Sequence, residues 1–425
     1  MSVESRIAVI GTGYVGLTTG ACFAHLGHDV VCADIDVDKV RRLQKGDVPI
    51  HEAGLEELVR EGLESGRLSF VVDSADAVGD ADFVYLCVPT PQSGDGSVDL
   101  KHLKAAAAEI SAHIRHGAIV VNKSTVPVGS TLLVEEAMNR PDIAVVSNPE
   151  FLREGTAVTD FLSPDRVVIG ADDPAVADRV ADLHRSIGAP VMITDPASAE
   201  TIKYAANAFL ATKLSFVNTI AAVCEAVGAD VGDVLAAMGL DKRIGGEFLV
   251  PGPGWGGSCF PKDTRAIISM AEDAGYDFSL MRGVLKANDE QFKRVVNKAA
   301  SAVSLNGSTV ALLGLAFKAG TDDTRNSPAL EIAGLLLAEG AKVRAYDPAV
   351  ATVDIDEIVV VDDPYAACEG AAVLVVATEW DEFRLLDLDK ISEAMVSRHV
   401  VDARNILDRE ALLSRGFTYQ GIGRN

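Results

Sequence analysis

Three apolar segments and one glycine-rich turn make up the first 35 residues. Residues 6–10 predict a buried strand, residues 17–26 predict an apolar helix, and residues 28–33 predict a second strand that closes at Asp34. Further short apolar runs, separated by helical patterns or turns, follow at residues 81–88, 118–122, 143–146 and 167–169. This succession predicts an open, mostly parallel sheet covered by helices.

The pattern changes in the middle of the chain. Between about Ser198 and Ala302 helical periodicity dominates, residues 198–227 predict one long helix, and a Gly/Pro-rich loop at 245–257 interrupts the helices. The apolar stretch 205–229 also contains four polar or charged residues, Asn207, Lys213, Asn218 and Glu225. Such residues fit a buried helix better than a membrane span.

The α/β pattern returns from Ser308. It predicts a strand at 309–314, a helix at 328–339 that starts with proline, a strand at 342–346 closed by Asp347, and a strand at 372–377. We therefore expect an α/β fold in which two Rossmann-like doubly wound domains are joined by a helical domain with one long central helix. The expected domains are residues 1–197, 198–302 and 303–425.

The charge balance excludes some classes of partner. Among 425 residues, 38 Lys and Arg oppose 62 Asp and Glu, which gives a formal net charge of −24. A surface this negative repels phosphate backbones and anionic lipid, so we expect neither nucleic acid nor membrane as a partner. The excess of carboxylates fits either adaptation to high salt or a merely acidic cytoplasmic protein.

Six cysteines are scattered through the chain without a CxxC pair, so no zinc or redox motif is predicted. His113 and His116 lack further ligands nearby in sequence, and we expect no metal site. No basic segment followed by a long apolar one begins the chain, so no signal peptide is expected. Reduced thiols and this N-terminus favour a cytoplasmic location.

The glycine-rich turn Gly11-Thr-Gly-Tyr-Val-Gly16 predicts a dinucleotide site. A strand precedes it, a helix follows, and Asp34 stands 18 residues beyond Gly16. Gly11 permits the tight turn, Gly13 lets the backbone approach a pyrophosphate, and Gly16 allows close helix packing. Asp34 would bind the ribose diol and repel a 2′-phosphate, which favours NAD over NADP. The alternative is a purely structural turn.

The loop Pro251-Gly-Pro-Gly-Trp-Gly-Gly-Ser-Cys-Phe-Pro-Lys-Asp263 is the most unusual segment. Pro261 predicts a helix start, so Cys259 would lie near a helix N-terminus with Lys262 close by. Both features lower a thiol pKa and make Cys259 a candidate nucleophile, although a lone cysteine is usually a packing residue. The other five cysteines lie in apolar runs and are expected in the core.

Polar residues elsewhere mark a second candidate cluster. Lys203 and Asn207 are four residues apart and share one helix face, where they form either a solvated stripe or the lining of a cleft that binds an oxyanion. Glu150 and Glu154 follow a predicted strand end, where open α/β sheets place ligands, and a carboxylate there can act as base or acid. Thr90 and Thr125 also follow strand ends.

Five dispersed motifs together resemble the nucleotide-sugar 6-dehydrogenase family. They are Gly11-x-Gly-x-x-Gly16, Ser124-Thr-Val-Pro-Val-Gly129, Asn148-Pro-Glu-Phe-Leu-Arg-Glu-Gly155, Gly256-Gly-Ser-Cys-Phe-Pro-Lys-Asp263 and Gly314-Leu-Ala-Phe-Lys-x-x-Thr-Asp-Asp-Thr-Arg325. The resemblance covers nearly the whole chain and is strongest to the UDP-glucose branch. It implies a four-electron oxidation at C6 of the sugar by NAD, through a thiohemiacetal and a thioester on Cys259, to the uronate.

The resemblance also implies residue roles. Cys259 would be the nucleophile, Lys203 and Asp263 would assist proton transfer, Glu150 would serve thioester hydrolysis, and Thr125 and Asn207 would order water or sugar. The implied cofactor contacts are Gly11, Gly13, Val15, Gly16, Asp34, Lys39, Thr90, Thr125, Glu154, Lys262 and Arg325. The implied substrate contacts are Phe151, Leu152, Arg153, Glu154, Lys203, Asn207, Arg243, Phe248, Leu249, Val250, Pro251, Gly252, Gly256 and Lys318.

Several alternatives stay open at this point. The family's central helical domain dimerises, and Arg243 resembles the arginine that reaches a neighbouring subunit, so a homodimer or higher homo-oligomer is expected. Pro251-Gly-Pro-Gly254 is similar to the N-acetylmannosamine branch, and the GDP-mannose branch shares Gly-Gly-Ser-Cys. A non-catalytic nucleotide-sugar or NAD binding protein and a two-electron dehydrogenase are the remaining possibilities.

Overall fold

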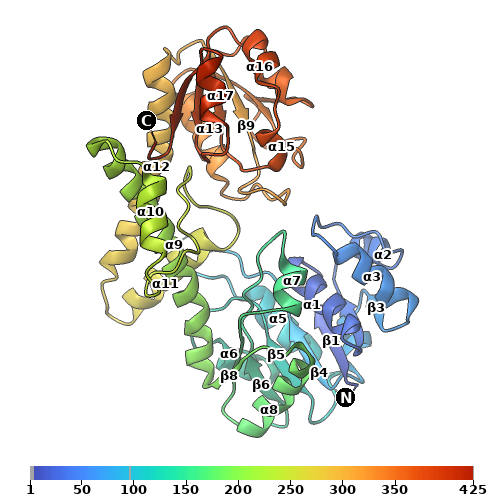
Figure 1. The fold of residues 1–425 in the computed structure, drawn as a ribbon. Coiled ribbons are helices and arrows are strands. Elements are labelled where there is room, and N and C mark those ends of the chain that lie inside the picture. Colours follow the sequence, from blue (N-terminus) through green and yellow to red (C-terminus); the bar gives the residue numbers. More distant parts are fainter. Residues whose placement is uncertain (1–3, 95–96, 425) are drawn as a thin grey trace. The chain divides into compact units, whose positions relative to one another are not determined.

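The apolar runs of the N-terminal half form an eight-stranded sheet (Figure 1). Its strands are β1 (Arg6–Ile10), β2 (Asp29–Ala33), β3 (Leu68–Val71), β4 (Phe83–Leu86), β5 (Ile119–Asn122), β6 (Ala144–Ser147), β7 (Val167–Gly170) and β8 (Val191–Thr194). Their order is β3-β2-β1-β4-β5-β6-β7-β8, and every pair is parallel except β6 with β7. The central parallel strands are buried on both faces, because helices cover both sides of the sheet.

Helices cover this sheet and connect its strands. They are α1 (Tyr14–His25), α2 (Val37–Leu43), α3 (Leu55–Glu64), α4 (Ser74–Val78), α5 (Lys101–Ser111), α6 (Ser130–Met138), α7 (Ala157–Leu162), α8 (Pro174–Leu183) and the 3-10 turn η1 (Arg185–Ile187). The sequence predicted that the first helix begins at residue 17, whereas α1 begins at Tyr14. The three extra residues belong to the glycine-rich turn, whose lack of apolar periodicity hid the first helical turn.

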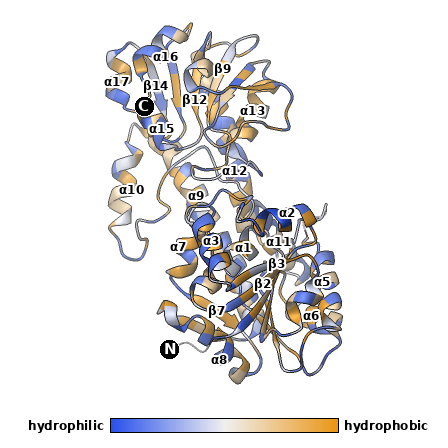
Figure 2. Cartoon of the chain, turned by 90° about the vertical axis from the view of Figure 1, so that its right-hand side faces the viewer, coloured by the Kyte–Doolittle hydropathy of each residue, from blue (hydrophilic) through white to orange (hydrophobic). Residues whose placement is uncertain are grey.

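A second, smaller sheet forms from the C-terminal part of the chain. It contains β9 (Thr309–Leu313), β10 (Lys342–Tyr346), β11 (Ile358–Val360), β12 (Val373–Val376), β13 (His399–Asp402) and β14 (Thr418–Gly421). All its pairs are parallel, in the order β11-β10-β9-β12-β13-β14, which is the doubly wound Rossmann order. Orange segments mark hydrophobic residues in its strands in Figure 2.

Four of the remaining helices come between the two sheets in sequence, and the other five connect the strands of the second sheet. They are α9 (Pro196–Val227), α10 (Val231–Gly239), α11 (Phe260–Asp273), α12 (Ser279–Ala302), α13 (Pro328–Ala338), α14 (Pro364–Cys368), α15 (Asp381–Arg384), α16 (Leu388–Ala394) and α17 (Arg409–Ser414). The predicted long helix and the proline that starts α13 are both present. The predicted fold class, with two Rossmann-like domains and one long central helix, is confirmed.

The structure is a computed structural model that describes residues 4–94 and 97–424. Its contacts separate the chain into two compact units, one from Met1–Ala206 with Arg265–Ala274 and the other from Asn207–Thr264 with Gly275–Asn425. The helix α9 therefore contributes to both units. The three domain boundaries expected from sequence stay a prediction.

Among the described residues, α9 is the helix that is long and apolar enough to cross a membrane by length and composition. Its N-terminal part is nevertheless tied into the first unit by charged side chains. Glu200 and Lys203 are both almost fully buried and hydrogen-bond to other elements of that unit. A buried charge needs such partners, which fits a helix built into a folded domain.

Candidate active site

The glycine-rich turn has the geometry that a dinucleotide requires. Gly11 has a φ of +97°, and a Cβ there would meet the Cys87 carbonyl oxygen at 2.7 Å. A Cβ on Gly16 would meet the Gly11 oxygen at 1.9 Å, whereas one on Gly13 would meet nothing within 4 Å. Gly11 and Gly16 are thus needed for packing, while Gly13, at the N-terminus of α1, leaves open space for a pyrophosphate. These residues fit NAD.

Asp34 lies at the end of β2, as the sequence predicted, and four groups fix its carboxylate, one of them the Asp36 N–H at 3.0 Å. It accepts hydrogen bonds from Thr12 N at 2.8 Å and Thr12 Oγ1 at 2.7 Å, and Lys39 Nζ lies at 2.9 Å. Burial opposes its ionisation, but the Lys39 and Thr12 hydrogen bonds outweigh it and hold the Asp34 pKa below its usual range. The carboxylate is therefore charged and oriented. Exposed Ile35 follows it and was not singled out from the sequence.

The corresponding acid of the second sheet has a different role. Asp347 is buried and accepts hydrogen bonds from Leu315 N, Ala316 N and Trp380 Nε1 at 2.7, 3.0 and 3.2 Å. A Cβ on Gly314 would meet Thr378 Oγ1 at 2.1 Å. Asp347 thus bonds the loop that follows β9, at residues 314–316. This agrees with the absence of a GxGxxG motif in that loop.

Glu150 and Lys203 form a buried ion pair in the first unit, with Lys203 Nζ 2.9 Å from Glu150 Oε1. Burial opposes ionisation of Glu150, but the Lys203 charge and hydrogen bond hold its pKa below the ordinary value. The Glu150 carboxylate also accepts from Leu152 N at 2.7 Å. Because Lys203 and Asn207 are both buried, the alternative of a solvated stripe is wrong.

A second buried lysine, Lys123, lies in the same unit and was missed by sequence reasoning. Its Nζ donates to Asn148 Oδ1 at 3.1 Å, and burial lowers its pKa. The only sequence signal was a lysine that directly follows an apolar strand.

A small cavity of about 10 Å³ lies in the same unit and is lined by Asn122, Ser124, Thr125, Val126, Ser147, Pro149, Glu200 and Lys203. The Thr125 carbonyl accepts from Thr90 Oγ1 at 2.9 Å.

Cys259 lies at the N-terminus of α11 in the second unit, as Pro261 predicted. Its carbonyl accepts the Asp263 N–H at 2.8 Å, and its Sγ is 3.6 Å from Ser258 Oγ. Cys259 is half-buried, whereas the other five cysteines are buried in the core. Burial raises the pKa of Cys22, Cys87 and Cys368 to about 12, which disfavours their thiolate forms.

An acid and its partners accompany Cys259. Asp263 is fully buried and accepts from Asn207 Nδ2 at 2.6 Å, and Lys262 Nζ lies 3.0 Å from its other oxygen. One turn of α9 separates Asn207 from Lys203. The helix thus carries one residue of each candidate cluster.

Buried amides hold the Gly/Pro-rich loop in place. Asn218 Oδ1 accepts from Gly252 N at 2.8 Å, Gln291 Nε2 donates to Gly252 O at 2.7 Å, and Asn288 bonds both backbone groups of Trp255 at 2.9 Å. Only glycine fits at position 256, where a Cβ would meet the Asn326 oxygen at 1.9 Å. Asn218, Asn288 and Gln291 were not predicted as site residues, because helical amides carry no motif.

The remaining predicted site residues lie in one unit or the other. The first unit holds Val15, Phe151, Leu152, Arg153 and Glu154, with Arg166 stacked 3.7 Å from the Phe151 ring. The second holds Arg243, Phe248, Leu249, Val250, Pro251, Lys318 and Arg325. Arg243 and Arg325, both exposed, pair with Asp241 and Asp323, each at 2.6 Å.

Sequence comparison matches all three parts of the chain to one family. Residues 5–188 match the NAD binding domain of the UDP-glucose/GDP-mannose dehydrogenase family, residues 197–290 its central domain, and residues 311–409 its UDP binding domain. The chain is a member of this family. The predicted resemblance is confirmed, and the cofactor of the N-terminal domain is NAD.

Named relatives resemble the chain over nearly its full length. The UDP-glucose 6-dehydrogenase TuaD of Bacillus subtilis is 44% identical over 99% of this chain and 93% of its own, and the Rhizobium meliloti UDP-glucose 6-dehydrogenase is 45% identical over 99% of both. A UDP-glucose dehydrogenase structure from Pyrobaculum islandicum superposes with a TM-score of 0.93 at 39% identity, covering 100% of this chain and 99% of that one. A UDP-D-ManNAc dehydrogenase from Pyrococcus horikoshii gives 0.89 at 30%, covering 99% of both.

Proposed function

We propose that this family member is an NAD-dependent UDP-glucose 6-dehydrogenase that produces UDP-glucuronate. The observation that carries the chemistry is Cys259, a half-buried thiol at the N-terminus of α11. One helical turn further on lies the buried Asp263, which contacts Asn207 and Lys262. A helix N-terminus and a neighbouring ammonium both favour the thiolate. Relatives named UDP-glucose 6-dehydrogenase at 44–45% identity support the choice of sugar over GDP-mannose or UDP-N-acetylmannosamine.

The reaction is a four-electron oxidation in balanced steps. Bound NAD⁺ supplies the hydride acceptor, once for each of the two oxidations. The C6 hydroxyl loses a proton and its carbon loses a hydride, which gives the aldehyde. The Cys259 sulfur then bonds to that carbon, and the carbonyl oxygen takes up a proton to form a thiohemiacetal. Loss of that proton and of a second hydride leaves a thioester, which water cleaves to the carboxylate and the free thiol.

The chain's own residues have distinct parts in these steps. Lys203 and Asp263 move protons and stabilise the oxyanions, and the Glu150 carboxylate is kept ionised by Lys203 to activate the hydrolytic water. Thr125 and Asn207 order water or sugar. Gly11, Gly13 and Gly16 would hold the pyrophosphate of NAD, and Asp34 its adenosine ribose.

Replacement of Cys259 tests this function. Cys259→Ala removes the nucleophile without adding bulk, and NADH formation with UDP-glucose should fall by about three orders of magnitude or more. NAD affinity, measured by fluorescence titration, should stay within twofold because the dinucleotide turn belongs to another element. Wild type should yield two NADH per UDP-glucose. Near-native turnover of the alanine variant with that ratio would refute the covalent mechanism.

A substrate panel tests the sugar. UDP-glucose, UDP-galactose, GDP-mannose and UDP-N-acetylmannosamine are each offered to the wild-type enzyme with NAD. The expected result is a kcat/KM for UDP-glucose that exceeds every other by at least tenfold. A preference for GDP-mannose or UDP-N-acetylmannosamine would move the assignment to that branch.

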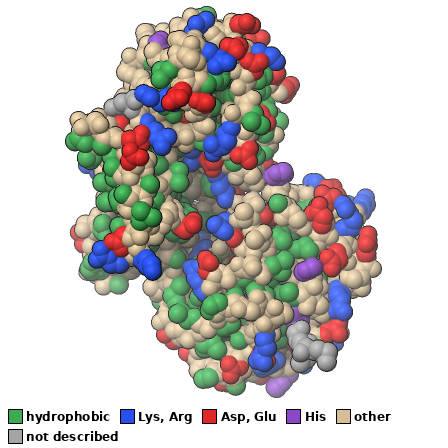
Figure 3. Space-filling model, in the orientation of Figure 1, with side chains coloured by type: hydrophobic (Ala, Val, Ile, Leu, Met, Phe, Trp, Pro, Cys, Tyr) green, Lys and Arg blue, Asp and Glu red, His purple; other side chains and the backbone are tan. Residues whose placement is uncertain are grey.

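We also propose that the chain forms a homodimer through α9. Phe209, Phe216 and Val223 are spaced seven residues apart, so they share one helix face, and each is about half-exposed or more. Hydrophobic side chains also gather over α10 in Figure 3. Apolar faces of this kind are buried in stable oligomers.

Analytical ultracentrifugation distinguishes the dimer from the monomer. Wild type should sediment as a dimer, Phe216→Glu should dissociate, and Leu385→Glu, at an exposed leucine elsewhere, should not. A fully active wild-type monomer would rule the dimer out.

Six cysteines without a disulfide fit a reducing compartment, and we place the reaction in the cytoplasm.

A further inference from the structure

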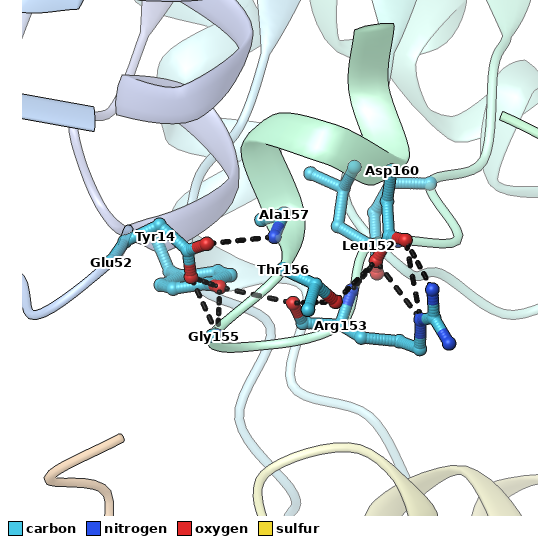
Figure 4. A network of polar contacts seen from close by, with 9 residues as sticks. Tyr14, Glu52, Leu152, Arg153, Gly155, Thr156, Ala157 and Asp160 are labelled. Atoms are coloured by element: carbon cyan, nitrogen blue, oxygen red, sulfur yellow. Dashed lines mark hydrogen bonds and ion pairs between the residues drawn. The ribbon is translucent and has the colours of Figure 1, made fainter. Parts of the chain in front are cut away.

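Tyr14 and Glu52 meet in a buried network that the proposed chemistry leaves unused. Tyr14 is the first residue of α1 and lies between two residues of the dinucleotide turn, while Glu52 comes from the loop before α3. The Tyr14 hydroxyl donates to the Glu52 carboxylate. Glu52 itself is 8% exposed. Figure 4 shows both side chains converging on the turn at residues 153–157.

The pair binds the backbone of that turn at three points. The Tyr14 hydroxyl donates to the Arg153 carbonyl oxygen at 3.3 Å. Gly155 N–H points to both partners, at 3.0 Å from Tyr14 Oη and 2.6 Å from Glu52 Oε2. Ala157 N–H, the first of α7, donates to Glu52 Oε1 at 2.8 Å. Gly155 has a φ of +84°, a backbone conformation that residues other than glycine rarely adopt.

Tyr14 is held as the hydrogen-bond donor of this contact. Burial, together with the Glu52 carboxylate, raises the pKa of Tyr14 well above its usual value. The hydroxyl therefore stays protonated and donates to Glu52, and its lone pairs remain available for the Gly155 N–H. A carboxylate that accepts three hydrogen bonds is a strong anchor for a turn.

The turn is held from its other side as well. Asp160 accepts from Arg153 N at 2.9 Å and pairs with the Arg153 guanidinium at 2.5 Å, and Glu150 holds Leu152 N. Residues 151–154 are the candidate substrate segment, and Glu154 is also a candidate cofactor contact. One end of this segment is thus fixed by the candidate base, and the other by a residue of the dinucleotide turn.

We propose that Tyr14 and Glu52 are positioning residues that couple the two ligand sites. Through Gly155 and Ala157 they fix the 151–154 segment to the turn that holds the NAD pyrophosphate, so that occupancy of one site orders the other. Neither side chain needs to touch a reacting atom. The role rests on the proposed function, because it assumes that these two segments bind NAD and the nucleotide sugar.

Tyr14→Phe is the sharpest variant because it removes one oxygen atom. The KM for NAD and for UDP-glucose should each rise about tenfold, the size expected for a lost buried hydrogen bond, while kcat falls less than threefold. Glu52→Gln should behave alike, and the double variant should cost no more than the larger single effect, since the pair acts as one unit. Tyr276→Phe, at an exposed tyrosine, is the matched control.

Hydrogen exchange gives a readout that does not depend on turnover. In wild type, NAD should slow hydrogen exchange at the Gly155 and Ala157 amides. In Tyr14→Phe and Glu52→Gln this protection should fall at least tenfold. The melting temperature of each variant should stay within a few degrees of the wild-type value. Unchanged protection and unchanged KM values would overturn the proposal. If wild type failed to oxidise UDP-glucose, the exchange and NAD titration would still decide whether the pair couples the turn to the cofactor site.

Discussion

A single carboxylate, that of Asp34, should decide between the two nicotinamide cofactors. Thr12 and Lys39 hold it charged at the end of β2. Asp34→Ala should weaken NAD binding about tenfold and raise the relative kcat/KM for NADP, because a repulsive charge disappears. Steady-state kinetics with both cofactors measure this. Asp38→Ala, at an exposed acid of α2, is the control, and equal use of NADP by wild type would contradict the assignment.

The buried Glu150–Lys203 pair makes a pH-dependent contribution to stability. Because the pKa of Glu150 lies below its ordinary value of 4.5, its stabilisation is complete above that value and is lost as the pH falls through the native pKa. Glu150→Gln removes the negative charge that faces the buried Lys203 ammonium and should cost about 3 kcal/mol at pH 7. Urea unfolding at pH 7 and pH 4 should show a smaller cost at pH 4. Glu57→Gln, on an exposed helix face, should show none at either pH.

At the scale of elements, α9 supplies the cap that α6 lacks. The residue before α6 is Gly129, which has no side chain to cap the helix. Glu200 of α9 replaces it: its carboxylate accepts from Gly129 N, Thr131 N, Thr131 Oγ1 and Ser147 Oγ, at 2.6 to 3.0 Å. Capping by a distant acid joins two elements that would otherwise meet only through apolar contacts.

Removal of that cap should therefore destabilise the first unit. Glu200→Ala leaves several buried donors without an acceptor, and we expect a loss of about 3 kcal/mol in the free energy of unfolding. Denaturant titration followed by circular dichroism measures it. The control is Glu136→Ala, at an exposed acid of α6 itself. Equal stability of the two variants would show that Glu200 is not the cap.

At the scale of the whole molecule, the net charge of −24 predicts a dependence on salt. On the face drawn in Figure 3, acidic and basic side chains are interspersed rather than gathered in patches of one sign. If the acidic excess reflects a saline cytoplasm, molar KCl should screen the repulsion and raise both the melting temperature and the activity. Thermal melts and NADH formation at low and molar KCl test this. If neither the melting temperature nor the activity rises with KCl, the negative charge serves solubility only.

The local pattern alone was enough to predict both Rossmann-like sheets, the long helix, the dinucleotide turn and the helix start beside Cys259. Buried parallel strands are continuous apolar runs, and positions such as Gly11 and Gly16 tolerate no other residue. Both signals are local, so a single sequence records them. Five strands were missed: β3, β8, β11, β13 and β14. Each is only three or four residues long, and so brief a strand has little apolar pattern.

Only the tertiary structure decided which polar residues are paired inside the protein. The Lys203 partner is 53 residues away in sequence, the Glu200 partners up to 71, and Tyr14 meets Gly155 across 141. Nothing in the sequence around Glu52 or Glu200 distinguishes them from surface charges. Burial makes the difference: a desolvated charge must find a partner, and the fold alone determines which distant group lies close enough to be that partner.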